Sequence, residues 1–182
     1  MRSFVVLLAA AALASCSDRA PDASDPAADP NALTITRDGA GRLGAATPFD
    51  TTAIRAALPA GFDTERHDGP SGAPVVWALR DGQIVFEVYP DAAGLAVGRV
   101  DAPNAAVAGP QGARPGQTFA EAGGADLDCA PGTDDLAGRA VCRSGGVDLV
   151  FASAALVGQT ALPPDAALAD ASLERIVWRA DG

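Results

Sequence analysis

The chain has 182 residues, enough for one domain of ordinary size, and 48 % of them are hydrophobic. Its 13 basic residues are all Arg, and its 23 acidic residues bring the formal net charge to −10. A surface of this sign repels phosphate backbones and anionic lipid head groups. The composition therefore argues against nucleic acid as a partner and against membrane binding through surface charge.

The first fifteen residues have the pattern of a signal peptide. Arg2 supplies a positive start, and the apolar stretch from 4 to 13 is too short to span a bilayer. Residues 13–16, Leu-Ala-Ser-Cys, look like a bacterial lipobox. In that setting Cys16 is acylated with a diacylglycerol, the chain is cut before it, and the new amine receives a third acyl chain. We therefore predict a signal peptide over 1–15 and a membrane partner bound through the acyl chains, in which each buried CH₂ contributes about 0.8 kcal/mol.

The residues after Cys16 indicate where the protein is sorted. Ser17 stands where an Asp would favour retention in the inner membrane, so we predict the periplasmic face of the outer membrane of a Gram-negative envelope. The segment from 16 to 31 consists mainly of Asp, Ala, Pro and Ser and contains no large apolar residue. It cannot bury enough surface to offset its ordering entropy, and we predict a disordered tether. A single domain is expected over 32–182.

From residue 32 onward the patterns are mainly those of β-strands. Asp81-Gly82 separates two β-rich runs and favours a type I′ turn, and the 144–146 segment, Ser-Gly-Gly, connects the two runs of a second hairpin. In the first hairpin, alternation predicts that Trp77 shares a face with Phe86, and that Glu87 lies on the other face. The predicted strands are 33–36, 75–80, 83–89, 95–100, 139–143, 147–151 and 173–179.

Two short segments carry signals for the start of a helix. Thr47 followed by Pro48 predicts an N-cap and a first helical residue, with Ile54 and Leu58 facing the core. The 118–121 segment, Thr-Phe-Ala-Glu, has a similar capping pattern. Together the signals predict an α+β fold, mainly an antiparallel β-sheet with one or two short helices.

A weak internal repeat accompanies these helix starts. Arg42 and Arg114 lie in two Gly-flanked loops, each preceding a helix start and then strands with a tight hairpin. Two interpretations stay open: two similar halves, or coincidence in a chain rich in Gly and Ala. The two arginines are candidate contact loops for an anion or a partner, although turn geometry explains the glycines equally well.

Residues 33–50 (LTITRDGAGRLGAATPFD), 112–119 (GARPGQTF) and the cysteine pair Cys129 and Cys142 carry a family resemblance. The chain resembles the small sigma-E-regulated envelope lipoproteins of unknown function, over most of the mature domain up to about Phe151. The resemblance implies a lipid-anchored α+β domain with no assigned catalysis.

Cys129 and Cys142 remain once Cys16 is lipidated. An even pair in an oxidising compartment predicts a structural disulfide, which stabilises the fold by about 3 kcal/mol in the chain-entropy model. The spacing does not fit a metal site, and the chain has one histidine. We expect neither a metal nor another cofactor.

The remaining candidates for chemistry have plainer explanations. His67 lies in a polar stretch without a G-x-S-x-G motif, and we interpret it as an exposed loop residue. Glu87 could be half of a carboxylate pair for glycan hydrolysis, but no sequence feature places its partner. We interpret Trp77 and Trp178 as core residues.

The sequence therefore favours a non-catalytic lipoprotein that faces the periplasm and binds an envelope protein or a cell-wall component. One alternative is an inhibitor of a lysozyme-type hydrolase, since the negative charge of the chain suits a cationic partner. Another alternative is an envelope hydrolase that uses carboxylates on the hairpin faces.

Overall fold

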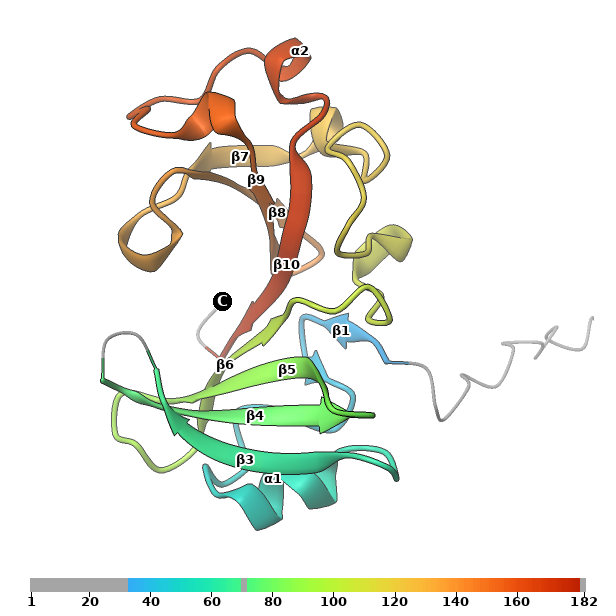
Figure 1. Ribbon diagram of the computed structural model, residues 1–182, viewed down its shortest axis with the longest axis vertical. Coiled ribbons are helices and arrows are strands. Elements are labelled where there is room, and N and C mark those ends of the chain that lie inside the picture. The colour runs from blue at the N-terminus through green and yellow to red at the C-terminus, as the bar shows by residue number, and fades with distance from the viewer. Residues whose placement is uncertain (1–32, 70–71, 181–182) are drawn as a thin grey trace, which may run out of the picture.

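The computed structural model describes residues 33–69 and 72–180. Its main feature is one eight-stranded antiparallel sheet with the order β3-β4-β5-β6-β10-β9-β8-β7. The order describes two consecutive four-stranded meanders that are joined through their last strands, β6 and β10. Figure 1 shows the two meanders at opposite ends of the molecule, with β10 running between them. The strands are β3 (Asp63–Asp68), β4 (Pro74–Arg80), β5 (Gln83–Pro90), β6 (Val97–Ala102), β7 (Asp128–Pro131), β8 (Arg139–Ser144), β9 (Val147–Ala152) and β10 (Ser172–Arg179).

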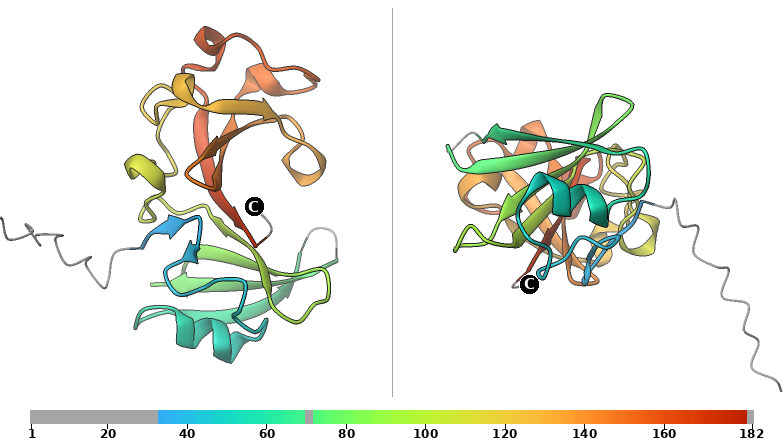
Figure 2. Two further views of the ribbon diagram at one scale, coloured as in Figure 1. Left: turned by 180° about the vertical axis from the view of Figure 1, so that it is seen from behind. Right: turned by 90° about the horizontal axis from the view of Figure 1, so that it is seen from below.

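The remaining elements are short. A small hairpin, β1 (Ile35–Thr36) and β2 (Gly39–Ala40), lies at the junction of the two meanders, as Figure 2 shows from behind. Trp178 of β10 anchors this hairpin by donating its indole N–H to the carbonyl of Arg37 at 2.8 Å. The helices are α1 (Thr51–Ala57) and α2 (Asp165–Leu168), and the 3₁₀ turns are η1 (Pro110–Gly112), η2 (Gly124–Asp126), η3 (Asp134–Leu136) and η4 (Ala154–Leu156).

The two halves repeat one hydrogen-bonding plan. In each half, a segment ahead of the meander crosses the start of its last strand and exchanges two backbone hydrogen bonds there. The bonds are Phe49 N to Leu95 O and Val97 N to Thr47 O in the first half, and Phe119 N to Ala171 O and Leu173 N to Gln117 O in the second. The structure therefore favours two similar halves over coincidence.

The pairing of β6 with β10 lies at the centre of this repeat. Asp101 and Val177 stand directly opposite each other in the register. Arg99 lies two residues before Asp101, and Arg175 lies two residues before Val177. The two arginines therefore occupy equivalent positions in the two halves.

One apolar core extends through both halves on one face of the sheet. Its largest fully buried side chains include Phe86 and Phe151 from the two meanders, Ile54 of α1 and Ile35 of the small hairpin. A second, smaller cluster on the opposite face consists of Leu136 of η3 with Val141, Val150 and Val177. The loop after β7 thus covers part of the face that the main core leaves open.

Several sequence predictions are confirmed. The mainly antiparallel α+β fold is present, and both tight hairpin turns have positive φ angles, 53° and 74° at Asp81 and Gly82 and 53° and 83° at Gly145 and Gly146. Ile54 of α1 is buried as expected. The predicted signal peptide (1–15), the lipidated Cys16 and the tether (16–31) lie outside the described residues. No helix in the part of the chain that the structure describes is long and apolar enough to cross a membrane.

The start of the first helix was predicted at the wrong residue. Asp50 caps α1, and its carboxylate accepts a hydrogen bond from the N–H of Ala53 at 2.9 Å. Pro48, expected as the first helical residue, instead forms an isolated bridge with Ala96. The backbone N–H of Val97 donates a hydrogen bond to the carbonyl of Thr47, so pairing with the start of β6 keeps Thr47 extended as well.

The expected surroundings of His67 and Trp77 were also wrong. His67 lies in the edge strand β3, opposite Val75, and not in a loop. Trp77 pairs with Glu87 and is half-buried on the face opposite the core, where His67 stacks on it with ring centroids 3.8 Å apart. A register irregularity between Ala78 and Leu79 shifts the alternation along β4 and β5, and this shift moves Trp77 to the other face from Phe86. Trp178, by contrast, is a core residue.

Candidate functional site: the charged face of the sheet

The sheet face opposite the core carries charged side chains that come from both meanders. Alternation along a strand places these residues on one side of the sheet and the apolar residues on the other. We call this surface the charged face. It consists of Glu87, Arg99, Asp101, Arg139, Arg143, Asp148, Glu174, Arg175 and Arg179, together with Asp135 from η3.

Asp101 lies at the centre of the charged face and is fully buried. Its carboxylate accepts hydrogen bonds from Nε and Nη2 of Arg99, both at 2.6 Å, and from Nη1 of Arg175 at 3.2 Å. Burying a carboxylate costs several kcal/mol unless it is paired and hydrogen-bonded. Because Arg99 and Arg175 occupy equivalent positions, each half of the molecule supplies one cation to this acid.

A second carboxylate lies beside Asp101. Glu87 of β5 is its direct partner in the register, and Glu87 also lies 3.7 Å from Arg175. The hydroxyl of Tyr89 donates a hydrogen bond to Glu87 at 3.1 Å. Burial, together with the charges of Glu87 and Asp101, raises the pKa of Tyr89 above its ordinary value. The phenol therefore stays protonated and acts as a donor.

Glu174 binds arginines from both sides. It accepts hydrogen bonds from Nε of Arg139 at 2.7 Å and from Arg175. Burial by itself raises the pKa of Glu174, but these hydrogen bonds and the two positive charges outweigh burial and hold its pKa below the ordinary value. Glu174 is thus an ionised link between β8 and β10.

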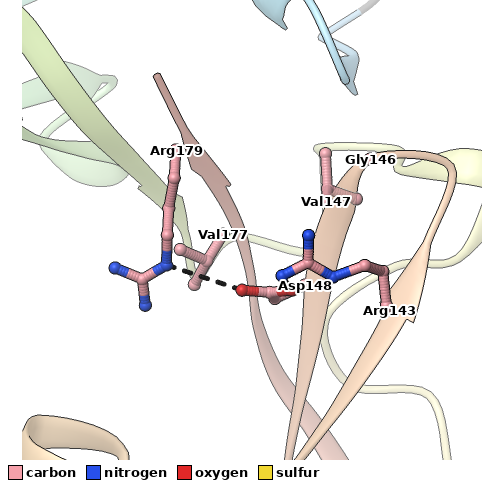
Figure 3. Close-up of a pocket in the computed structure, with 6 residues that line it drawn as sticks. All are labelled: Arg143, Gly146, Val147, Asp148, Val177 and Arg179. Atoms are coloured by element: carbon pink, nitrogen blue, oxygen red, sulfur yellow. Dashed lines mark ion pairs between the residues drawn. The ribbon is translucent and has the colours of Figure 1, made fainter. Parts of the chain in front are cut away.

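Asp148 of β9 is shared by two arginines, as Figure 3 shows. Arg143 of β8 lies 3.3 Å away on one side, and Nε of Arg179 of β10 lies 3.5 Å away on the other. The terminal nitrogens of Arg179 point away from Asp148 in this view (Figure 3). Two cations therefore share one carboxylate, and Arg179 keeps donors that this ion pair does not use.

A pocket opens next to Arg179, where β6 and β10 meet. Its volume is about 590 Å³, and Tyr89, Arg99 and Arg179 line it together with the turn at 90–93. Asp135 approaches Arg99 here, with its Oδ2 2.7 Å from Nη1. A volume of this size is typical of sites for small molecules.

The two cysteines form the predicted disulfide. Cys129 of β7 and Cys142 of β8 are directly opposite in the register, and their sulfur atoms are bonded at 2.02 Å. The bond fixes β7, the last strand at its end of the sheet, to the neighbouring strand. It therefore holds the start of the loop that carries Leu136 and Asp135 onto the charged face.

The structure places Arg42 and Arg114 apart from the charged face and apart from each other. Arg42 donates to the carbonyl of Ala56 at the end of α1 at 2.8 Å, and Arg114 donates to the carbonyl of Ala106 after β6 at 3.1 Å. Both side chains are exposed. Each arginine thus stabilises a backbone segment of its own half.

The two arginines are also not equivalent in the repeat. The backbone N–H of Gly44 donates to the side chain of Thr47, and the N–H of Arg114 donates in the same way to the side chain of Gln117. Gly44 is therefore the counterpart of Arg114, two residues beyond Arg42. The two Gly-flanked loops are therefore equivalent in the repeat, but the side chains of Arg42 and Arg114 are not.

Sequence analysis did not find the charged face. A signal was available, because Arg99 lies in the predicted strand 95–100 and Asp101 follows that strand directly, so a strand one residue longer places both on one face. The partner Arg175 is 74 residues from Asp101, and no local pattern connects them. Within residues 33–69 and 72–180, no group of three or more His, Cys, Asp or Glu side chains is arranged to hold a metal ion.

Comparison with known proteins places this fold among uncharacterised ones. The crystal structure of the uncharacterized protein yfeY from Escherichia coli is similar, with a TM-score of 0.56 and 21 % sequence identity. The match covers 81 % of this chain and 98 % of that one, and at this identity it shows a shared fold alone. No curated protein matches in sequence. A family model described as a protein of unknown function (DUF1131) matches residues 27–180, which include both meanders. The chain therefore belongs to the DUF1131 family of proteins of unknown function.

Proposed function

We propose that this protein is a lipid-anchored envelope protein that binds another envelope component and has no catalytic activity of its own. The observation that carries the binding role is the charged face, where the buried Asp101 holds Arg99 and Arg175 from the two halves in fixed positions. Side chains that are already ordered lose little entropy on association. Such a surface suits recognition of a partner whose charges match it.

The proposed location rests on two kinds of support. The Leu-Ala-Ser-Cys segment ending at Cys16 supports lipid anchoring, and Ser17 supports sorting to the outer membrane. The disulfide between Cys129 and Cys142 fits an oxidising compartment such as the periplasm, because disulfides are rare where thiols are kept reduced.

The geometry of the two neighbouring carboxylates supports a binding role over hydrolysis. A glycoside hydrolase needs one carboxylic acid that donates a proton and one carboxylate that acts as a base or nucleophile. Both oxygens of Asp101 accept hydrogen bonds from guanidinium groups, so this carboxylate is already used in holding the two arginines. Glu87 meanwhile accepts from Tyr89 and faces Arg175. The contacts of Glu87 and Asp101 therefore link neighbouring strands.

Two experiments test the proposal. Mass spectrometry of the protein from its native membrane is expected to find an N-terminal Cys16 carrying acyl chains, and an uncleaved leader or a bare thiol there would refute the anchor. Cross-linking in intact cells, followed by capture of the full chain, is expected to recover an envelope component. Arg143→Glu, on the charged face, is expected to reduce that recovery, whereas Arg42→Glu, outside it, is the matched control.

The same purified protein tests the two alternatives. Release of fragments from peptidoglycan by the purified chain, lost in Glu87→Gln, would overturn the non-catalytic role. Inhibition of lysozyme by the chain at stoichiometric amounts would identify the enzyme as the partner. We expect neither peptidoglycan cleavage nor lysozyme inhibition. The Arg143→Glu and Arg42→Glu variants are expected to differ only in how much of the cross-linked envelope component each recovers.

A further inference from the structure

Two arginines of the charged face lie opposite each other at the pocket. Arg99 of β6 and Arg179 of β10 are direct partners in the register, so their side chains leave the same face of the sheet. Like charges placed directly opposite on neighbouring strands are destabilising unless an anion lies between them. Both arginines line the pocket of about 590 Å³.

Asp135 supplies an anion at this point from outside the sheet. It lies on η3, its side chain is 60 % exposed, and its Oδ2 is 2.7 Å from Nη1 of Arg99. Burial raises the pKa of Asp135, but the hydrogen bond and charge of Arg99, together with the charge of Arg179, lower it below the ordinary value. The charges of both arginines therefore act on Asp135, although Asp135 lies on a surface turn outside the strands.

Other donors and acceptors around the pocket already have hydrogen-bond partners within the protein. Two donors of Arg99 bind Asp101 beneath the pocket. Asp91 at the turn accepts hydrogen bonds from the backbone N–H groups of Leu95 and Ala96. Arg179, whose only ion pair among the described residues is the 3.5 Å contact with Asp148, has donors left for a ligand.

We propose that this pocket binds a ligand through a carboxylate, which displaces Asp135 from Arg99 and also contacts Arg179. The remaining wall suits a small apolar body, because the turn at 90–93 contributes Pro90 and two alanines and Tyr89 contributes its ring. A carboxylate fits better than a phosphate, since Asp101 and Asp148 lie close by and a doubly charged group meets more repulsion. This site goes beyond the proposed envelope role, and it is tested without the membrane partner.

The test is calorimetric titration of the full chain in non-ionic detergent with N-acetyl-alanyl-alanine, with its C-terminal amide, and with inorganic phosphate. The acid is expected to bind about tenfold or more tightly than the amide, because a charge-assisted hydrogen bond to arginine is lost with the carboxylate. Equal affinities for acid and amide, or tighter binding of phosphate, would overturn the proposal.

Three variants locate the site. Asp135→Asn removes the competing carboxylate and is expected to tighten binding of the acid several-fold, whereas Arg179→Gln is expected to weaken it about tenfold. Arg42→Gln is the matched control, because Arg42 lies outside the charged face and does not line the pocket. Thermal melting establishes that each variant folds, and Asp135→Ser replaces Asp135→Asn if the latter does not. No tightening on loss of Asp135, or an unchanged affinity in Arg179→Gln, contradicts the assignment.

Discussion

Replacing Asp101 with Asn tests whether the buried carboxylate holds the two halves together. The variant keeps the shape of the side chain but removes the charge that accepts from Arg99 twice at 2.6 Å and from Arg175 at 3.2 Å. Removing one partner of a buried ion pair costs about 3–5 kcal/mol. We expect about 3 kcal/mol, the low end, because Arg99 keeps Asp135 and Arg175 keeps Glu174. That is a large share of a total stability of about 5–15 kcal/mol.

Equilibrium unfolding in urea, followed by tryptophan fluorescence, measures the loss. Asp135→Asn is the matched control, because Asp135 also binds Arg99 at 2.7 Å but is largely exposed. An exposed pair contributes about 0–1 kcal/mol, so the control is expected to stay within that range. The reasoning is refuted if Asp101→Asn costs less than about 1 kcal/mol, or if the two variants cost the same.

Three further predictions concern stability. Replacing both disulfide cysteines with alanine is expected to lower the free energy of unfolding by about 3 kcal/mol, and a change below about 1 kcal/mol in urea unfolding would contradict the chain-entropy argument. The Gly39→Ala variant is expected to melt at a clearly lower temperature than the Gly61→Ala variant. Both positions have positive φ, but only at Gly39 would the new Cβ lie 1.8 Å from a backbone oxygen. Equal melting temperatures would contradict this expectation. The depressed pKa of Glu174 makes it a stabilising anion above the ordinary glutamate range, and this contribution is lost as the pH falls through the lower folded pKa. Acid titration of the melting temperature should therefore show a smaller acid-induced loss in Glu174→Gln than in the wild type, and identical curves would remove Glu174 from the explanation.

Local sequence patterns predicted the hairpins because their turns depend on neighbouring residues. Asp81-Gly82 and Gly145-Gly146 adopt the positive φ angles that a tight turn between twisted strands requires. The same patterns missed β3, whose residues are mostly charged. An edge strand has one neighbour, β4, and its backbone pairing does not need apolar side chains.

Pairing with another segment explains where prediction from a single segment failed. Pro48 has the sequence features of a helix start, yet its bridge to Ala96 keeps it extended and moves the cap to Asp50. The face of Trp77 depends on an irregularity between β4 and β5 that alternation within one strand does not reveal. In both cases pairing with another segment decides the conformation that the local pattern leaves open.

The sequence by itself determined the fold class, the two hairpins and the cysteine pair, because strand alternation, turn residues and cysteine number act over short distances. Only the tertiary structure decided that Arg99, Asp101 and Arg175 meet, since their contact depends on β6 pairing with β10 across 74 residues. That pairing follows from burying one apolar core beneath both halves, and burial places the opposite face of both strands side by side. The charged face is therefore a consequence of how the core closes.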